Sequence, residues 1–437
     1  MKVFVNWISP IFFLIILMGM AYGLERTDAW ALQVCYAILF GLFLFSYWRS
    51  QEIGFVRLLV IGCLSRLLLI PHTPFLSDDF YRFLFDGHLI LQGINPYTYL
   101  PQEALQQVSE NSLSYMSLLV EQMNSSSYFS IYPPLHQVFF VGAALGGQSL
   151  VWNLILLRLP LILVDMGVLF FLWKLLPLWN QDRSKVLLYW LNPLIILELT
   201  GNVHFEGLVL LGLLGSIWFF KTSKPMTSAS LWGFAIGVKL LPAIMGAVWL
   251  RVFPPLKHTR FWLTFTFICL IVLFPLFQAD TFHNFYQSFR LYQSSFEFNA
   301  SLYYVLRFLS SFWLDYNPIG TLGPVLNFLA IIGMLFFAWR QPKPIDLATG
   351  FVGTYGIYLV VQTTVHPWYI IPMLGLSLLT RYSSPLLWSA LVFLSYTAYT
   401  SDPTEELTLL LLVQYIPLLI FAAKELFDPN QDIPETP

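Results

Sequence analysis

Charged residues are scarce in this chain. They make up 11% of the 437 residues, whereas apolar residues make up 57%. A soluble domain carries about 25% charged residues, so the composition excludes an ordinary soluble enzyme and predicts an integral membrane protein. The net charge is −2, which offers no basic surface for nucleic acid and excludes that class of partner.

Cysteine and the common catalytic motifs are also missing. The three cysteines, Cys35, Cys63 and Cys269, lie in apolar runs, where they are typical small hydrophobic residues rather than disulfide partners or metal ligands. The sequence contains no glycine-rich nucleotide loop, no zinc-protease helix motif and no serine-hydrolase elbow. We therefore expect no cofactor, no bound metal and no nucleotide site.

Long apolar runs fill most of the chain. A transmembrane helix needs about 20 predominantly apolar residues, and runs near that length lie at 7–24, 29–47, 53–70, 131–147, 150–177, 186–201, 204–220, 229–250, 261–278, 322–339, 346–364, 367–380, 384–400 and 407–423. The first run lacks a clear cleavage site, so we expect it to remain as a span. The pattern predicts an all-α, polytopic membrane helix bundle with about 11 to 14 transmembrane helices, in a single domain of residues 1–437.

Two polar segments interrupt the apolar runs, at 71–130 and 279–300. Lysine and arginine in the short connections favour the cytoplasm, which puts both segments on the extracytoplasmic side, the first as a loop that carries surface helices. Residues 131–185 do not fit this scheme, because their apolar length suggests two crossings whereas the orientation requires an odd number. A break at Pro160 or a re-entrant segment would remove the conflict.

The first polar segment carries two adjacent acids, Asp78 and Asp79. Adjacent side chains on a helix diverge by about 100°, so we expect the two carboxylates to have different tasks. One would act as general base toward an acceptor hydroxyl, and the other would position the acceptor or its partner. The alternative is helix capping by Ser77 or Asp78, which accounts for one acid but not for both.

Other residues of this segment have both functional and structural interpretations. Arg82 follows Asp78 at the helical spacing of a salt bridge, so it either forms that pair or contacts the substrate. Tyr81 is a further candidate for substrate binding. We expect Asp86 and Gly87 to end the helix.

Ionisable and aromatic residues also gather at the ends of later runs on the same predicted face. Such groups are costly in a membrane and usually face a cavity. The candidates for substrate or donor-phosphate binding are His204, Glu206, Lys239, His366, Trp368 and Tyr369, and Glu297 and Asn299 end on the same face. Snorkelling of Lys239 and an interfacial position of His204 are the structural alternatives. Arg158 and Asp165, on one helical face, are expected to form a structural pair or a helix-packing contact, and Arg66 is expected to snorkel.

Several blocks of the sequence resemble the GT-C superfamily of polytopic glycosyltransferases, most closely the bacterial polyprenol-phosphate-mannose-dependent mannosyltransferases. The resemblance is carried by SDDFYRFLFDGHLILQGINPY (77–97), IYPPLHQ (131–137), RLPLILVD (158–165), NPLIILELTGNVHFEG (192–207), GVKLLP (237–242) and HPWY (366–369). Phe85 and His88 stand where that family usually has tryptophan and arginine.

This resemblance implies a membrane mannosyltransferase. The donor would be a sugar, mannose by the resemblance, carried on a polyprenyl phosphate. The acceptor would be a hydroxyl of a lipid or glycan, attacked with inversion while Asp78 or Asp79 serves as base. The protein would lie in the bacterial plasma membrane with its active site on the extracytoplasmic side.

Two other functional classes stay open. A transporter or flippase would favour polar sites at the middle of broken helices, often in two related halves, whereas these polar residues lie at one edge and no repeat is visible. A lipid-linked oligosaccharide ligase or polymerase is expected to have a longer external loop with several arginines.

Overall fold

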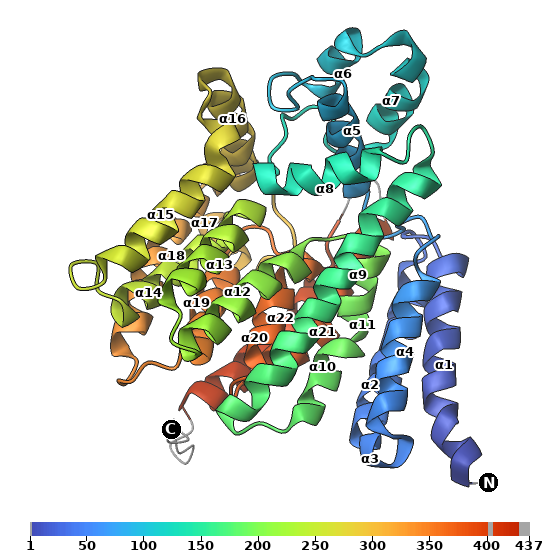
Figure 1. Cartoon of the computed structure of the whole chain (residues 1–437), viewed down its shortest axis with the longest axis vertical. Helices are drawn as coiled ribbons and strands as arrows, with labels where there is room; N and C mark the ends of the chain where they lie inside the picture. Colours follow the sequence, from blue (N-terminus) through green and yellow to red (C-terminus); the bar gives the residue numbers. More distant parts are fainter. Residues whose placement is uncertain (1, 401–404, 428–437) are drawn as a thin grey trace.

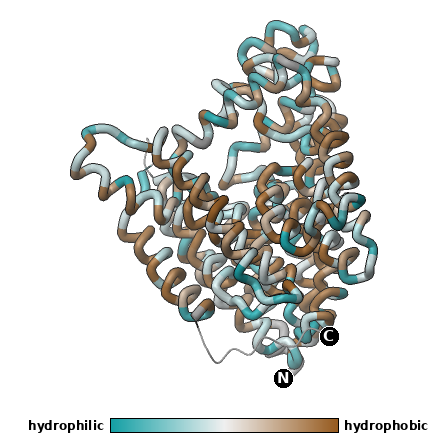
Figure 2. The backbone as a smooth tube through the Cα atoms, turned by 90° about the vertical axis from the view of Figure 1, so that its left-hand side faces the viewer, coloured by the Kyte–Doolittle hydropathy of each residue, from teal (hydrophilic) through white to brown (hydrophobic). Residues whose placement is uncertain are grey.

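The computed structural model of the protein describes residues 2–400 and 405–427, and these are 76% helical. Within those ranges there is no strand, only an isolated bridge between Phe298 and Thr364. Figure 1 shows long helices side by side, with a smaller group of helices over one end. Figure 2 shows hydrophobic residues along the long helices and more hydrophilic ones in the connections. The predicted all-α membrane bundle is confirmed.

Five helical segments in the described part of the chain are long and apolar enough to cross a membrane: α2 (Ala29–Trp48), α9 with η2 (Leu150–Trp179), α15 with η6 (Thr259–Phe277), α18 (Ile319–Arg340) and α22 (Thr408–Leu426 of Thr408–Phe427). A sixth candidate is the pair Pro193–Gly201 and Glu206–Lys221, which is bent by 113° at its break. Shorter apolar helices lie at Ile8–Gly23, Leu241–Val252 and Leu347–Val361. The expected total of spanning helices stays a prediction, because many apolar runs form short pieces rather than one long helix.

The remaining elements complete the bundle and its connections. At the N-terminal side these are α1 (Lys2–Gly23), α3 (Ser50–Ile53) and α4 (Phe55–Leu68). The middle of the chain forms η3 (Arg183–Val186), α10 (Leu187–Trp190), α11 (Pro193–Ile195), η4 (Ile196–Gly201), α12 (Glu206–Lys221), α13 (Pro225–Val238), η5 (Leu241–Met245) and α14 (Gly246–Val252). Later come α16 (Ala279–Ser295), α17 (Leu302–Ser310), α19 (Leu347–Val361), η7 (Pro367–Ile370), α20 (Ile371–Ser377), α21 (Ser384–Leu391) and η8 (Val392–Thr400). The segment 279–300, expected as a loop, is thus mostly the helix α16.

The helices over the end of the bundle come mainly from the first polar segment. It forms α5 (Asp79–Leu91), α6 (Pro101–Ala104), η1 (Leu105–Gln107) and α7 (Glu110–Gln122). Helix α5 runs through Asp86 and Gly87, so the expectation that these two residues end it was wrong. Gly87 has another purpose: a Cβ there would lie 2.1 Å from the carbonyl oxygen of Phe140. Helix α5 therefore approaches α8 (Pro134–Ala144) more closely than any other residue at 87 would allow.

The lengths of helices α8 and α9 bear on how many times residues 131–185 cross the membrane. Helix α8 has 11 residues, about 16 Å at 1.5 Å per residue, which is too short for a hydrocarbon core of about 30 Å. Figure 1 shows it lying across the end of the bundle. Helix α9 continues through Pro160 without a break, so the suggestion of a break there was wrong, and by length and composition this stretch has one candidate spanning helix.

Two buried arginines tie the bundle together. Arg66 does not snorkel, because it is fully buried and its Nε donates to Asp165 Oδ2 at 2.5 Å. Arg158 does not pair with Asp165; it donates to the carbonyl oxygens of Ile70, Thr200 and Gly201 at 2.7 to 2.8 Å. Arg158 thereby fixes the end of η4 against α9. The expected Arg158–Asp165 pair was wrong because residues beyond their own helix offered both groups closer partners.

Candidate active site

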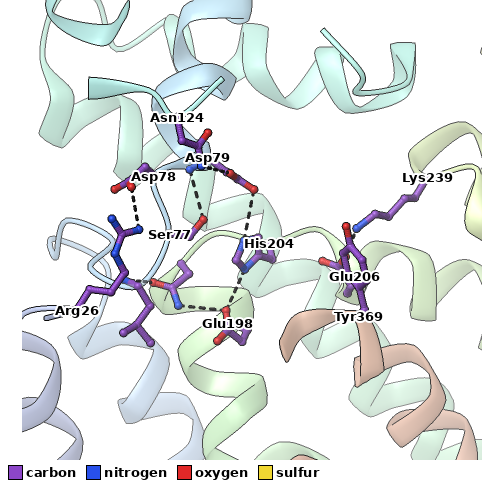
Figure 3. A network of polar contacts seen from close by, with 12 residues as sticks. Arg26, Ser77, Asp78, Asp79, Asn124, Glu198, His204, Glu206, Lys239 and Tyr369 are labelled. Atoms are coloured by element: carbon purple, nitrogen blue, oxygen red, sulfur yellow. Dashed lines mark hydrogen bonds and ion pairs between the residues drawn. The ribbon is translucent and has the colours of Figure 1, made fainter. Parts of the chain in front are cut away.

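The first turn of α5 separates the two adjacent acids (Figure 3). Asp78 occupies the N-cap position, but its side chain makes no capping hydrogen bond. It forms an ion pair instead, with its Oδ2 2.8 Å from Arg26 Nη1. Ser77 Oγ accepts the backbone N–H of Asp79 at 3.3 Å. The Asp79 carboxylate points elsewhere, and its Oδ1 accepts a hydrogen bond from Asn124 Nδ2 at 3.2 Å.

A π-helical turn faces Asp79 from inside the bundle. This turn, η4, contains Glu198, which is fully buried. The Glu198 carboxylate accepts hydrogen bonds from His204 Nδ1 at 3.0 Å, Asn202 Nδ2 at 3.1 Å and the Tyr396 hydroxyl at 2.7 Å. Between Asn202 and His204, Val203 adopts a φ of 58°, which is rare for a β-branched residue. The turn holds this strain while it directs His204 outward, and such strained turns are common at functional sites.

His204 connects this turn to Asp79. Its Nε2 lies 4.0 Å from Asp79 Oδ2 and is buried without a hydrogen-bond partner in the described structure. The imidazole is stacked on Trp368, with ring centroids 3.7 Å apart and 19° between the planes. The Asp79 side chain keeps 24% of its surface exposed, so a substrate can reach the carboxylate while His204 stays enclosed.

The Lys239 ammonium lies close to Tyr369, the residue that follows Trp368. Helix α13 ends at Val238, and Lys239 leaves it in an extended conformation. The Lys239 ammonium pairs with Glu206, the first residue of α12, and lies 4.4 Å from the ring centroid of Tyr369. The Tyr369 hydroxyl is 2.6 Å from that of Tyr292 on α16. This group therefore combines a positive charge, two phenols and an aromatic face.

His366 lies beside the same tryptophan. Its ring is parallel to that of Trp368, at a centroid distance of 4.5 Å. Burial, followed by the nearby His204 and Lys239, lowers the pKa of His366 to about 3. The imidazole is therefore neutral at pH 7. Its Nδ1 is buried and makes no hydrogen bond within the described residues, so it is available to a ligand as a neutral group rather than as a cation.

These contacts join most of the predicted residues into one continuous group. Asp79 leads to His204, then to Trp368, His366 and Tyr369, and then to Lys239 and Glu206. Tyr81 lies at the edge, half-buried against Phe80, and burial and the Asp78 charge raise its pKa.

Arg82 and Glu297 are placed differently. Arg82 is buried, and its Nε donates to Asp86 Oδ1 at 2.7 Å while its Nη1 binds the carbonyl oxygens of Ser125 and Tyr128. It forms no pair with Asp78, contrary to one of the two expected roles. Glu297 pairs with Arg307 and accepts from Tyr303, apart from the group above. Asn299 lies next to Phe298, whose ring stacks on His366, but its own contacts go to Val365 and Glu406.

Several residues of this group escaped the sequence analysis. Glu198 had a usable signal, because it is an acid inside an apolar run, and such residues are rarely without a role. Arg26, Asn124 and Tyr292 lie in segments with no pattern that points to them. Among residues 2–400 and 405–427, no three His, Cys, Asp or Glu side chains lie close enough to hold a metal ion.

Comparison with known proteins gives the family. The sequence model of the alpha-(1->6)-mannopyranosyltransferase N-terminal domain matches residues 30–253, about half of the chain. This range includes Asp79, Glu198, His204 and Lys239, whereas His366 lies beyond it. No curated protein and no solved structure gives a significant match. The chain belongs to the alpha-(1->6)-mannopyranosyltransferase family, a GT-C-type family, and is a multi-pass membrane mannosyltransferase.

Proposed function

We propose that the protein transfers mannose from a polyprenyl-phosphate donor to an acceptor hydroxyl on the extracytoplasmic side, with Asp79 as general base. The observation that carries this proposal is the divergence of the two acids. Asp78 is neutralised by Arg26, whereas Asp79 is partly exposed and faces the group of histidines and Lys239. Of the two candidate bases, Asp78 has a short ion pair to its carboxylate, whereas the nearest ionisable partner of Asp79 is His204 at 4.0 Å.

The reaction needs one displacement. Asp79 takes the proton of the acceptor hydroxyl as the acceptor oxygen bonds to the anomeric carbon. The bond from that carbon to the phosphate oxygen breaks, and the polyprenyl phosphate leaves with the electron pair. The family description gives an α-linked product, so a single inverting displacement requires a β-linked donor sugar.

The phosphate end of the donor fits the opposite side of the group. Negative charge develops on the leaving phosphate, and fixed positive charge and hydrogen-bond donors stabilise it. Lys239 supplies the charge and is held in place by Glu206. The neutral His366 and the paired phenols of Tyr369 and Tyr292 supply hydrogen bonds. Arg82 has no place in this subsite because its guanidinium is buried and bound to Asp86 and to two carbonyl oxygens, whereas the paired Lys239 keeps 29% of its side chain exposed.

Trp368 and Tyr81 are the remaining candidates to which we assign a role in the proposed site. Trp368 is 7% exposed and stacks with both His204 and His366, which favours a role in aligning the two imidazoles over direct stacking on a sugar. Tyr81 lies on the Asp78 side of the entrance, where an acceptor would approach. The extracytoplasmic position is supported by the excess of lysine and arginine in the short connections.

The donor requirement tests this proposal. Purified protein in detergent would be given polyprenyl-phosphate mannose or a nucleotide-linked mannose, with an extract of membrane glycolipids as acceptor. We expect mannosyl transfer from the lipid donor alone, and none from the Asp79→Asn variant. Transfer that depends on the nucleotide sugar would overturn the proposed donor, and full activity of Asp79→Asn would overturn the proposed base.

A further inference from the structure

Glu198 is a buried acid whose position is not explained by packing alone. Its carboxylate is 0% exposed and lies in the bent apolar pair that is a candidate membrane span. Ionisable groups in such positions are costly and usually functional, and single π-helical turns occur frequently at functional sites. No lysine or arginine lies within ion-pair distance of Glu198 in the described structure; the titratable groups in contact with its carboxylate are His204 and Tyr396.

The hydrogen bonds of Glu198 determine which nitrogen of His204 carries a proton. Glu198 Oε2 already accepts a hydrogen bond from the Asn202 amide, and as a carboxylate oxygen it also accepts from His204 Nδ1–H across their 3.0 Å contact. In the neutral imidazole, Nε2 is then an acceptor with a free lone pair. This atom faces Asp79 Oδ2 at 4.0 Å and has no other partner among the described residues. Two acceptors therefore face each other, and one added proton converts this contact into an attraction.

We propose that His204 and Glu198 form a proton-exit path for Asp79. This inference rests on the proposed role of Asp79 as the base that removes the acceptor proton. After the displacement, the O–H bond of the protonated Asp79 breaks and an N–H bond forms at His204 Nε2. Asp79 returns to the carboxylate form while the product still occupies the site. The imidazolium then lies between the two carboxylates of Asp79 and Glu198, which stabilise its charge. When the product leaves, Nε2 returns the proton to Asp79, and the proton passes to solvent from Asp79, the exposed member of the pair.

Within this path the two residues have distinct tasks. His204 carries the proton, whereas Glu198 touches neither sugar nor phosphate and is a positioning residue. Glu198 fixes the ring through Nδ1, and Asn202 donates to the same carboxylate oxygen, Oε2, whereas Tyr396 donates to the other oxygen, Oε1. The 4.0 Å gap to Asp79 exceeds hydrogen-bond length, and catalytic contacts of this kind commonly shorten only when substrate binds.

Other charged or titratable groups also face His204. His136 on α8 and His366 before η7 both interact electrostatically with His204 and with Lys239. These groups remain in every variant considered below. A difference between pH–rate profiles therefore reports the change at Glu198 or His204 and not the background of the site.

The variant Glu198→Gln tests the inference, because it keeps the size of the side chain and one acceptor oxygen for His204 and removes the charge, while the new amide N–H can donate to the Tyr396 hydroxyl. We expect kcat to fall by about 10²-fold, at the lower end of the range for proton-transfer catalysis, with little change in the KM for polyprenyl-phosphate mannose. The acid limb of the pH–rate profile should move to lower pH, since an imidazole without its negative neighbour binds a proton less readily. A wild-type kcat and profile would overturn the inference.

Tyr396→Phe is the matched control. It removes a hydrogen bond to the same carboxylate but keeps the Glu198 charge and its contact with His204. We expect a nearly wild-type kcat and an unchanged profile. If both variants lose activity equally and neither profile moves, Glu198 has only a structural role and the inference fails.

Two further variants keep the result decisive. Asp79→Asn separates the two proposals: an active Asp79→Asn enzyme overturns the proposed base, whereas an inactive one beside a wild-type-like Glu198→Gln overturns only the exit path. If Glu198→Gln does not fold, His204→Gln replaces it, because glutamine can still donate to Glu198 but has no basic nitrogen. A wild-type profile for His204→Gln would contradict the exit path, and loss of kcat with unchanged donor KM would support it.

Discussion

The acids at the start and in the middle of α5, Asp79 and Asp86, have contrasting surroundings. Asp86 is fully buried and accepts from Arg82 at 2.7 Å, Ser130 at 2.5 Å and Gln137 at 3.0 Å. Asp79 is 24% exposed, and its contact with His204 is 4.0 Å long. One carboxylate has every partner it needs, and the other has room for a ligand. This difference separates an acid that holds the fold from an acid that is ready for chemistry.

The most severe loss of stability is expected at the fully paired acid. Asp86→Asn leaves the Arg82 guanidinium buried without its charge partner, and breaking a buried pair typically costs about 3–5 kcal/mol. The free energy of unfolding in detergent should fall by about that amount, while mannosyl transfer per folded molecule stays close to wild type. If activity is lost and stability is retained, the distinction between the two acids is wrong.

Packing around Gly87, the next residue of α5, gives a second, smaller effect. Gly87→Ala places a methyl group against the Phe140 carbonyl, and such overpacking costs about 1–3 kcal/mol. Gly142→Ala on α8 is the control, since a Cβ there meets nothing within 4 Å. Thermal melts should show a lower midpoint for Gly87→Ala alone. Equal midpoints would mean that α5 and α8 are not in close contact.

Low pH should lower the stability of the folded protein by protonating His366, which lies in the same group as Asp79. The folded-state pKa of His366, about 3, lies below the unfolded value of about 6.5. The stability contributed by the neutral ring is therefore present above pH 6.5 and is lost as the pH falls toward 3. We expect the thermal midpoint of the wild type to fall over this range, and that of His366→Phe to fall less. Parallel pH curves for the two proteins would contradict the burial of a neutral His366.

The smallest effect is expected at Asp78. Arg26 and Asp78 are each about a third exposed, and an exposed ion pair contributes roughly 0–1 kcal/mol. Arg26→Gln should therefore change the thermal midpoint little and leave the pH–rate profile in place. A large loss of kcat in this variant would show that Asp78, and not Asp79, lies at the reacting atoms.

Sequence reasoning reached the membrane class because composition and apolar length determine it, and it reached the acids because they interrupt that pattern. It also predicted that His204, Lys239 and His366 lie on one face, since polar groups at span ends are conspicuous, and the structure brings the three into one group. It did not predict the partners of Arg82, Arg158 and Arg66, because the choice among several possible partners depends on which helices pack together. The length of α8 was missed for a similar reason: the apolar run at 131–147 satisfies a core contact with α5 as well as it would satisfy lipid.

The role of Asp79 is tested most directly by measuring kcat and the thermal midpoint together for Asp78→Asn and Asp79→Asn with a polyprenyl-phosphate mannose donor. We expect Asp79→Asn to lose about 10²–10⁴-fold in kcat, the usual worth of a general base, with a midpoint equal to that of the wild type. Asp78→Asn should lose far less. An Asp79→Asn enzyme that works at the wild-type rate would contradict the account.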